Sequence, residues 1–147
     1  MVTPQSRRFD ARIELFLEVR NFIERFCAEA GVSNRASTRL ILIIEELFAN
    51  TVSHGYSRAD GGVAEWPVWL ILTAVGDSIE AVYEDAASAH DPFAKVVVPD
   101  YTGPAESWKV GGLGIAIVTK LGHDVHYERT GGRNRIRVAV AIPPSGT

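Results

Sequence analysis

Apolar residues recur at three- and four-residue steps through the first third of the chain, and this spacing predicts two amphipathic helices. The first helix is expected over residues 13–29, and Gly31 ends it. Ser33 is placed to cap the second helix, which is expected to run to about His54 and to close at Gly55. Each helix presents one apolar face, so each should pack against another layer of structure.

The rest of the chain contains short runs rich in β-branched and aromatic residues, which predict strands. The expected strands are residues 5–10, where the signal is weak, 68–75, 78–84, 124–129 and 134–142. Gly76-Asp77 is a good two-residue hairpin turn, and Thr130-Gly131-Gly132 turns the last hairpin. A short helix through Leu121 is expected between the two hairpins. This order predicts a two-layer α/β (α+β) sandwich, with a mostly antiparallel sheet covered by helices on one face.

Two segments lack any sustained period. Residues 57–66 are typical of a surface loop, and residues 86–111 are dominated by Ala, Ser, Gly and Pro. A loop of the second length inside a compact domain is uncommon unless it is a lid or a binding loop. The chain of 147 residues is expected to form a single domain, with a frayed tail over 143–147.

Hydrophobic residues make up 46% of the chain and charged residues 22%, as in ordinary globular proteins. The net charge of −3 argues against general affinity for nucleic acid. The last hairpin nevertheless carries a basic cluster of Arg129, Arg133, Arg135 and Arg137. We interpret this cluster as the solvent-facing side of the hairpin, so no direct nucleic-acid partner is expected.

The single cysteine, Cys27, excludes internal disulfides and fits a reducing compartment. It lies in the apolar pattern of the first helix, which favours a small core residue over a nucleophile. The first residues lack the apolar segment of a signal peptide, and no apolar run is long enough to span a bilayer. The sequence therefore predicts a cytoplasmic protein with no membrane partner.

Glu46 and Asn50 lie one helical turn apart on the second helix and share a face. Their flanks are Leu42, Ile43 and Ala49 rather than the charged residues of a solvated face. A carboxylate and a carboxamide in apolar surroundings cost free energy unless a hydrogen-bond partner or an ion pairs with them. The pair is therefore either a pocket wall, where oxygen ligands would suit Mg²⁺, or a buried pair that caps a helix or satisfies the core.

Two further elements follow in an order that suits a nucleotide. Asp85 stands where a strand ends and the irregular segment begins, and Asp91-Pro92 follows it. The run Gly111-Gly112-Leu113-Gly114 leads into the short helix, where backbone N–H groups and the helix dipole favour an anion. A helical Glu and Asn, a strand-end Asp, a loop and a glycine-rich helix start together predict one nucleotide cradle.

Three ordered motifs make the sequence similar to a known family. Residues 46–50 followed by 53–56 resemble its N box, whose usual form is E-x-x-x-N-x-x-x-H-G-Y. Gly112-Leu113-Gly114-Ile115 resembles its second glycine box, and residues 127–129 with 132–135 are similar to its final hairpin. The chain thus resembles the Bergerat-fold (histidine kinase-like) ATPase family over nearly its whole length, most closely the stand-alone anti-sigma factors that are serine/threonine kinases.

The resemblance implies ATP and Mg²⁺ as cofactors, and it implies a role for each motif residue. Glu46 would be the general base that orients and deprotonates a Ser or Thr hydroxyl of a partner protein. Asn50 would ligate Mg²⁺, and Asp85 would accept a hydrogen bond from the adenine amino group. Phosphoryl transfer needs mostly positioning and charge stabilisation, so this small set suffices.

The phosphate side of the implied site lies in and just after the second irregular segment. Residues 95–111 would form the lid over the phosphates, with Lys109 as a phosphate contact. Gly112, Leu113 and Gly114 would receive the phosphates at the start of the following helix.

One part of the sequence departs from the family pattern. The family's first glycine box reads D-x-G-x-x-F-D-P, but here Ala87 replaces the glycine and His90 replaces the aromatic residue. Glycine is used where the backbone approaches a ligand closely or takes positive φ. We therefore expect Ala87, as part of the adenine site, to weaken ATP binding through steric contact or an unfavourable φ, and Ala87→Gly to tighten it.

The leading hypothesis is an ATP-dependent serine/threonine kinase that acts on a small anti-anti-sigma-type protein and sequesters a sigma factor. One alternative is a binding module of the same fold whose nucleotide site is weakened or empty and which regulates by contact alone. Another is an ATP-binding domain of a different signalling pathway. A homodimer is left open.

Overall fold

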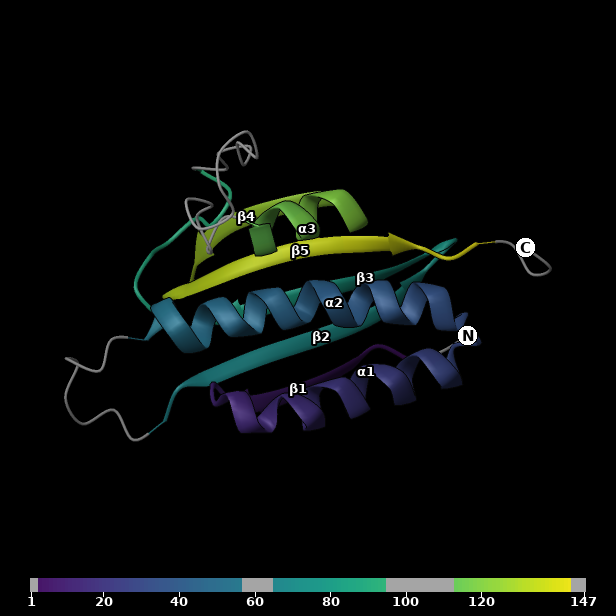
Figure 1. Cartoon of the computed structure of the whole chain (residues 1–147), viewed down its shortest axis with the longest axis horizontal. Helices are drawn as coiled ribbons and strands as arrows, with labels where there is room; N and C mark the ends of the chain where they lie inside the picture. Colours follow the sequence, from purple (N-terminus) through teal and green to yellow (C-terminus); the bar gives the residue numbers. More distant parts are fainter. Residues whose placement is uncertain (1–2, 57–64, 95–112, 144–147) are drawn as a thin grey trace, which may run out of the picture.

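The computed structural model describes residues 3–56, 65–94 and 113–143. Within these residues an open five-stranded sheet is covered on one face by three α-helices (Figure 1). In chain order the elements are β1 (Gln5–Asp10), η1 (Ile13–Leu15), α1 (Phe16–Glu29), α2 (Asn34–Asn50), η2 (Thr51–Gly55), β2 (Pro67–Val75), β3 (Ser78–Asp85), α3 (Leu113–Leu121), β4 (His123–Thr130) and β5 (Arg133–Ala141). This arrangement confirms the predicted sandwich.

Every neighbouring pair of strands is antiparallel, and the strand order is β1-β2-β3-β5-β4. Helix α1 lies over the β1–β2 side of the sheet, α3 over the β4–β5 side, and α2 between them (Figure 1). The C-terminal end of β3 and the start of β5 meet beside the C-terminal end of α2, where Asp85 lies opposite Asn134 and contacts Thr51. The weak strand signal at the start of the chain is confirmed as β1, an edge strand paired with β2.

The ends of the two long helices follow the sequence signals. Gly31 takes φ +71° after α1, a conformation that costs glycine little. The Ser33 side chain accepts a hydrogen bond from the backbone N–H of Ala36 at 3.3 Å and so caps α2. The last turn, η2, is a π-helix that ends at Gly55, close to the expected end. Single π-helical turns are rare and are frequently found at functional sites, and this one borders the cavity described below.

The two hairpins have tight turns built from glycine. Gly76 has φ +57°, and Gly131 and Gly132 have φ +58° and +75°. Two consecutive residues with positive φ suit a two-residue hairpin turn, which explains why the last hairpin reverses at a Gly-Gly pair. Strand β4 accordingly extends to Thr130, one residue beyond the prediction.

Alternate residues of the inner strands face the helices and form one core with them. The largest fully buried side chains are Phe26, Phe48, Ile23, Leu40, Ile43, Ile44, Leu47, Leu70, Leu72, Ile79, Val19 and Val68. Cys27 is buried in the same core, as predicted, and this burial raises the pKa of its thiol. None of the described helices has the length and apolar character needed to cross a membrane.

The arginines of the last hairpin divide between the two faces of the sheet. Three of them lie on the face away from the helices, where each has an acidic neighbour: Arg133 with Glu84, Arg135 with Glu128, and Arg137 with Glu80. Arg133 also lies over the Trp69 ring, 3.5 Å from its centroid. Arg129 is also exposed, but it is paired across the ladder with Asn134 and so lies on the other face of the sheet from these three.

Candidate functional site

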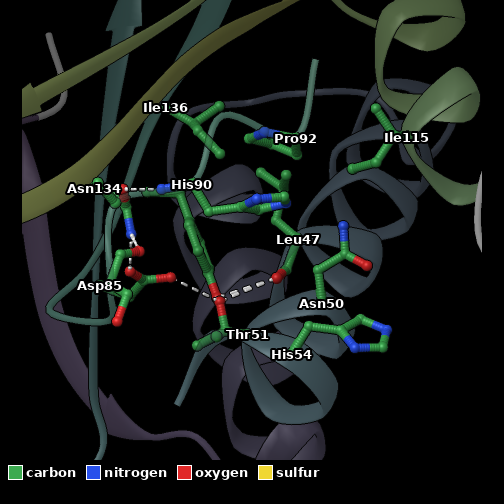
Figure 2. A pocket seen from close by; sticks show the side chains of 14 residues that line it. Leu47, Asn50, Thr51, His54, Asp85, His90, Pro92, Ile115, Asn134 and Ile136 are labelled. Atoms are coloured by element: carbon green, nitrogen blue, oxygen red, sulfur yellow. Dashed lines mark hydrogen bonds between the residues drawn. The ribbon is translucent and has the colours of Figure 1, made fainter. Parts of the chain in front are cut away.

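A cavity of about 470 Å³ opens where the end of β3 meets η2, β5 and the start of α3. Its apolar lining comes from Leu47, Tyr83, Pro92, Ile115 and Ile136. Its polar lining includes Asn50, Thr51, His54, Asp85, Ser88, His90 and Asn134. Figure 2 shows Asp85 and Asn134 on one side of the cavity and Asn50 and His54 on the other. The structure thus brings the predicted Asn50 and Asp85 into one site.

Asp85 is the last residue of β3, and its carboxylate is buried and held by three neutral donors. The Thr51 hydroxyl donates to Oδ2 at 3.0 Å, and the Asn134 amide donates to Oδ1 at 2.8 Å. The backbone N–H of Ala87 donates to Oδ1 at 3.2 Å. A carboxylate has about four acceptor positions, so Asp85 keeps capacity for one more donor from the cavity.

A buried relay of hydroxyl groups sets the direction of Asp85. The Tyr83 hydroxyl lies 2.6 Å from Thr51 Oγ1, and both hydroxyls lie 3.2 Å from the backbone oxygen of Leu47 (Figure 2). Complete burial raises the pKa of Tyr83 well above its ordinary value, so its hydroxyl stays neutral and can donate. The carboxylate is the strongest acceptor of the group, and the Thr51 proton is therefore assigned to Asp85.

Asn134 is buried and stands directly opposite Asp85 in the β3–β5 ladder. Its side-chain amide makes five contacts: Nδ2 lies 2.8 Å from Asp85 Oδ1, 2.9 Å from the Ser88 oxygen and 3.4 Å from the Ala87 oxygen, while Oδ1 accepts from His90 N at 3.1 Å and from the Tyr127 hydroxyl at 2.6 Å. One side chain thus ties the end of β3, the following loop and β4 together.

Two more side chains hold the loop after Asp85. The Tyr56 hydroxyl accepts from the backbone N–H of Ala86 at 2.8 Å and donates to the oxygen of Pro67 at 2.6 Å. The Arg129 guanidinium donates to the oxygen of Ala87 at 2.7 Å. The backbone from Asp85 to His90 is therefore held on one side by Tyr56, just after η2, and on the other side by Arg129 and Asn134 of the last hairpin.

Ala87 lies inside this loop, buried and with its side chain outside the cavity lining. Among the described residues only Asp124 combines a side chain with positive φ, so the expected φ penalty at Ala87 is wrong. The Ala87 methyl group packs against Gly55, which has no side chain. If Gly55 carried a Cβ, that atom would lie 3.5 Å from the Ala87 Cβ.

Glu46 faces a different neighbour from Asn50, although both lie on α2. Asn50 lines the cavity, whereas Glu46 lies partly buried beneath Gly114 at the start of α3. Burial raises the pKa of Glu46, and the nearby charge of Glu45 raises it further. The prediction that Glu46 and Asn50 have apolar surroundings is only partly right. Ile43 is buried in the core, but Leu42 is 43% exposed to solvent.

The remaining predicted site residues belong to the phosphate side. The expected lid over 95–111, with Lys109, and also Gly112 lie outside the described residues. Leu113 is the first residue of α3, and Gly114 follows it against Glu46.

Sequence reasoning missed several residues that build the site. The helical phase of Thr51 places it on the core-facing side of the second helix, which hides its polar role, and Tyr56 belongs to the N box without an assigned role. Tyr83 and Asn134 lie in runs of alternating strand residues, at the positions that face the core. A polar group at such a position needs a partner, which is the signal that could have identified both.

The family comparison matches residues 9–140 with the histidine kinase-like ATPase domain. This match covers most of the chain. The chain belongs to the histidine kinase-like ATPase family. The family suits the geometry, because Asn50 and Asp85 meet at a cavity beside a helix start. A comparison with curated proteins found no match.

One solved structure similar to the chain is the crystal structure of the RsbU and RsbW domains of Rv1364c from Mycobacterium tuberculosis. The TM-score is 0.65 with 18% sequence identity, and the alignment covers 96% of this chain. The chain spans 33% of that longer protein. The likeness shows that the two share a fold.

Proposed function

We propose that the chain binds ATP with Mg²⁺ in the cavity at the end of β3 and transfers phosphate to a Ser or Thr of a small anti-anti-sigma-type protein. In the same proposal it acts in the cytoplasm and sequesters a sigma factor. The observation that carries the nucleotide part is the carboxylate of Asp85, which is held by neutral donors at a cavity of about 470 Å³ and retains acceptor capacity.

The cavity fits an adenine base by size and chemistry. Its volume of about 470 Å³ falls within the range of small-molecule sites. Leu47, Ile115 and Ile136 offer apolar side chains to a flat ring. Asp85 is an acceptor for an exocyclic amino group, and the donors around it fix the direction in which its oxygens point.

Asn50 and Glu46 support the phosphate part of the proposal. The Asn50 amide lines the cavity, and amide oxygens are hard ligands that suit Mg²⁺. Burial raises the pKa of Glu46, which favours proton transfer nearer to neutral pH, and we assign it as the general base for the partner hydroxyl. We assign Lys109 and residues 112–114 to the phosphates. Bound Mg-ATP supplies the phosphoryl group, and the chain positions it and the acceptor hydroxyl.

The choice of partner rests on two likenesses, one of sequence motifs and one of fold. The motifs and final hairpin of the sequence resemble those of stand-alone anti-sigma kinases. The solved structure with a similar fold includes a domain named RsbW. Both support a regulatory protein partner for this member of the histidine kinase-like ATPase family.

The rival function is a binding module that regulates by contact alone. It is favoured by Ala87 and His90, which stand where the family has glycine and an aromatic residue. The position of the Ala87 methyl group weakens this argument, because that group packs on Gly55 and leaves the cavity lining to its neighbours.

Titration calorimetry with Mg-ATP separates the two functions. We expect the wild-type chain to bind ATP and Asp85→Asn to lose at least about tenfold in affinity, because the near-isosteric amide presents donors where the carboxylate accepts. Transfer of labelled phosphate to a small partner protein tests the kinase part, with Glu46→Gln as the matched control. No binding by the wild type at millimolar ATP would leave the binding module as the function.

A further inference from the structure

The hydrogen-bonding capacity of Asn134 is used entirely inside the protein. A carboxamide offers two N–H donors and about two acceptor positions on its oxygen. Three acceptors surround Nδ2, and two donors, the His90 N–H and the Tyr127 hydroxyl, point at Oδ1. Asn134 borders the cavity, yet it retains no polar group for a ligand.

The partners of Asn134 are the groups on which base recognition would depend. Asp85 Oδ1 is fixed by Asn134 on one side, while Oδ2 is fixed by Thr51 on the other. The same amide holds the oxygen of Ser88 and the N–H of His90, so it sets both the carboxylate and the wall beside it (Figure 2). Loss of the Asn134 amide would therefore free the Asp85 carboxylate and the neighbouring backbone of Ser88 and His90 at the same time.

We propose that Asn134 is a positioning residue that gives the cavity its preference for adenine over guanine. This inference rests on the proposed function, in which Asp85 accepts from the amino group of the base. Guanine presents a carbonyl oxygen at the corresponding place, and an oriented carboxylate repels it. A carboxylate that can turn away discriminates less. The selectivity therefore depends on the amide that holds Asp85.

The test compares Asn134→Asp with the wild type by calorimetry, using Mg-ATP, Mg-GTP and inorganic tripolyphosphate as ligands. The variant keeps an oxygen that can accept from His90 and Tyr127, but it places a second carboxylate against Asp85. At about pH 8 we expect ATP affinity and the ATP-to-GTP preference each to fall by roughly tenfold, with tripolyphosphate affinity unchanged. A general loss of structure would weaken all three ligands together.

Lowering the pH provides a second readout. Two facing carboxylates raise the pKa of one of them, so as the pH falls they come to share a proton, and the protonated variant side chain can again donate to Asp85. ATP selectivity should therefore recover in Asn134→Asp as the pH falls, and should not recover in Asn134→Ala. Tyr127→Phe is the matched control, because it removes a single hydrogen bond from Oδ1 and should leave the selectivity intact.

Three results would overturn the inference. A folded Asn134→Asp with the wild-type ATP-to-GTP ratio would show that Asn134 does not position Asp85. If that variant does not fold, an unchanged ratio in Asn134→Ala has the same meaning. A wild-type chain that binds ATP and GTP equally would show that the cavity has no preference for adenine, so Asn134 could not produce one. A wild type that binds neither nucleotide would instead refute the proposed function, and the inference with it.

Discussion

The Cα of Gly114 lies so close to the side chain of Glu46 that a Cβ there would come within 2.9 Å of Glu46 Cδ. The glycine therefore leaves room for the Glu46 carboxylate where α3 packs on α2, whatever its role toward phosphate. The atoms in the way are the end of a flexible side chain, so an added methyl group would turn the carboxylate aside rather than separate the helices. This contact links the second glycine box to the N box.

Gly114→Ala should therefore impair activity far more than folding. Alanine gains up to about 1 kcal/mol of helix propensity over glycine, which offsets the cost of moving Glu46. We expect the free energy of unfolding in urea to change by less than about 1 kcal/mol, while phosphate transfer falls by at least about tenfold. A variant that keeps full transfer activity would show that the position of Glu46 is not critical.

Glu46→Gln should be more stable than the wild type near neutral pH. Burial and the Glu45 charge raise the pKa of Glu46 above its ordinary value of 4.5, so the ionised carboxylate is disfavoured in the folded state. Its contribution to stability is full below the ordinary pKa and is lost as the pH rises through the raised one. Thermal unfolding should show a higher Tm for Glu46→Gln at about pH 7 and no difference at about pH 4.

Glu45→Gln is the control for this effect, since it removes only the second cause of the shift. We expect a smaller gain in Tm from it than from Glu46→Gln. Equal gains would mean that repulsion between the two charges, and not burial, raises the pKa.

Most of the fold could be predicted because each element follows a local rule. The apolar spacing of α1 and α2, the glycine turns and the strand alternation all act within a few residues of one another. Arg129 shows the limit of that reasoning. Grouping it with Arg133, Arg135 and Arg137 ignores strand pairing, which places it opposite Asn134 on the helix-covered face.

The candidate site was predicted only in part, because its support comes from pairs of residues far apart in the sequence. Asn50 and Asp85 were predicted from motifs. The partners of Asp85, Thr51 and Asn134, lie 34 and 49 residues away from it and meet it only through the sheet and η2. The helical phase of Thr51 indicates a buried position, which agrees with its burial but does not reveal its hydroxyl contacts.

Asn50→Ala should weaken Mg²⁺-dependent nucleotide binding with little effect on folding. The side chain is partly exposed at the cavity and belongs to the last residue of α2, where alanine is well tolerated. Calorimetry with ATP in the presence of Mg²⁺, and again with EDTA, should show a loss of at least about tenfold only when Mg²⁺ is present. An equal loss in both conditions would mean that Asn50 contacts the nucleotide rather than the metal.

Thr51→Val should destabilise the fold and also disturb the site. Valine keeps the shape but removes the hydroxyl between Tyr83 and Asp85, leaving a buried phenol and a buried carboxylate oxygen each short of one partner. We expect a loss of about 1–3 kcal/mol in the free energy of unfolding. Thr51→Ser keeps the hydroxyl and is the matched control. If Thr51→Ser loses stability and Thr51→Val does not, the methyl group rather than the hydroxyl is what matters at this position.

The last prediction concerns Ala87, where the sequence led us to expect weakened ATP binding and a gain from glycine. Its methyl group is buried against Gly55, and its φ is not in the positive range. Ala87→Gly should therefore leave ATP affinity unchanged within a few-fold. It should lower stability by about 0.4–1 kcal/mol, because glycine adds freedom to the unfolded chain.

Gly55→Ala tests the same contact from the other side. Its Cβ would lie 3.5 Å from the Ala87 Cβ, an ordinary contact, and 3.3 Å from Thr51 Cγ2, which must give by a few tenths of an ångström. Because the Thr51 hydroxyl donates to Asp85, this shift should weaken ATP binding. Ala87→Gly in the same chain gives the new methyl group room to move away from Thr51 and should restore at most part of the affinity. Calorimetry on the two single variants and the double variant measures this coupling. Tightening of about tenfold by Ala87→Gly alone would mean that the methyl group does hinder the base, and that the sequence-based expectation was right.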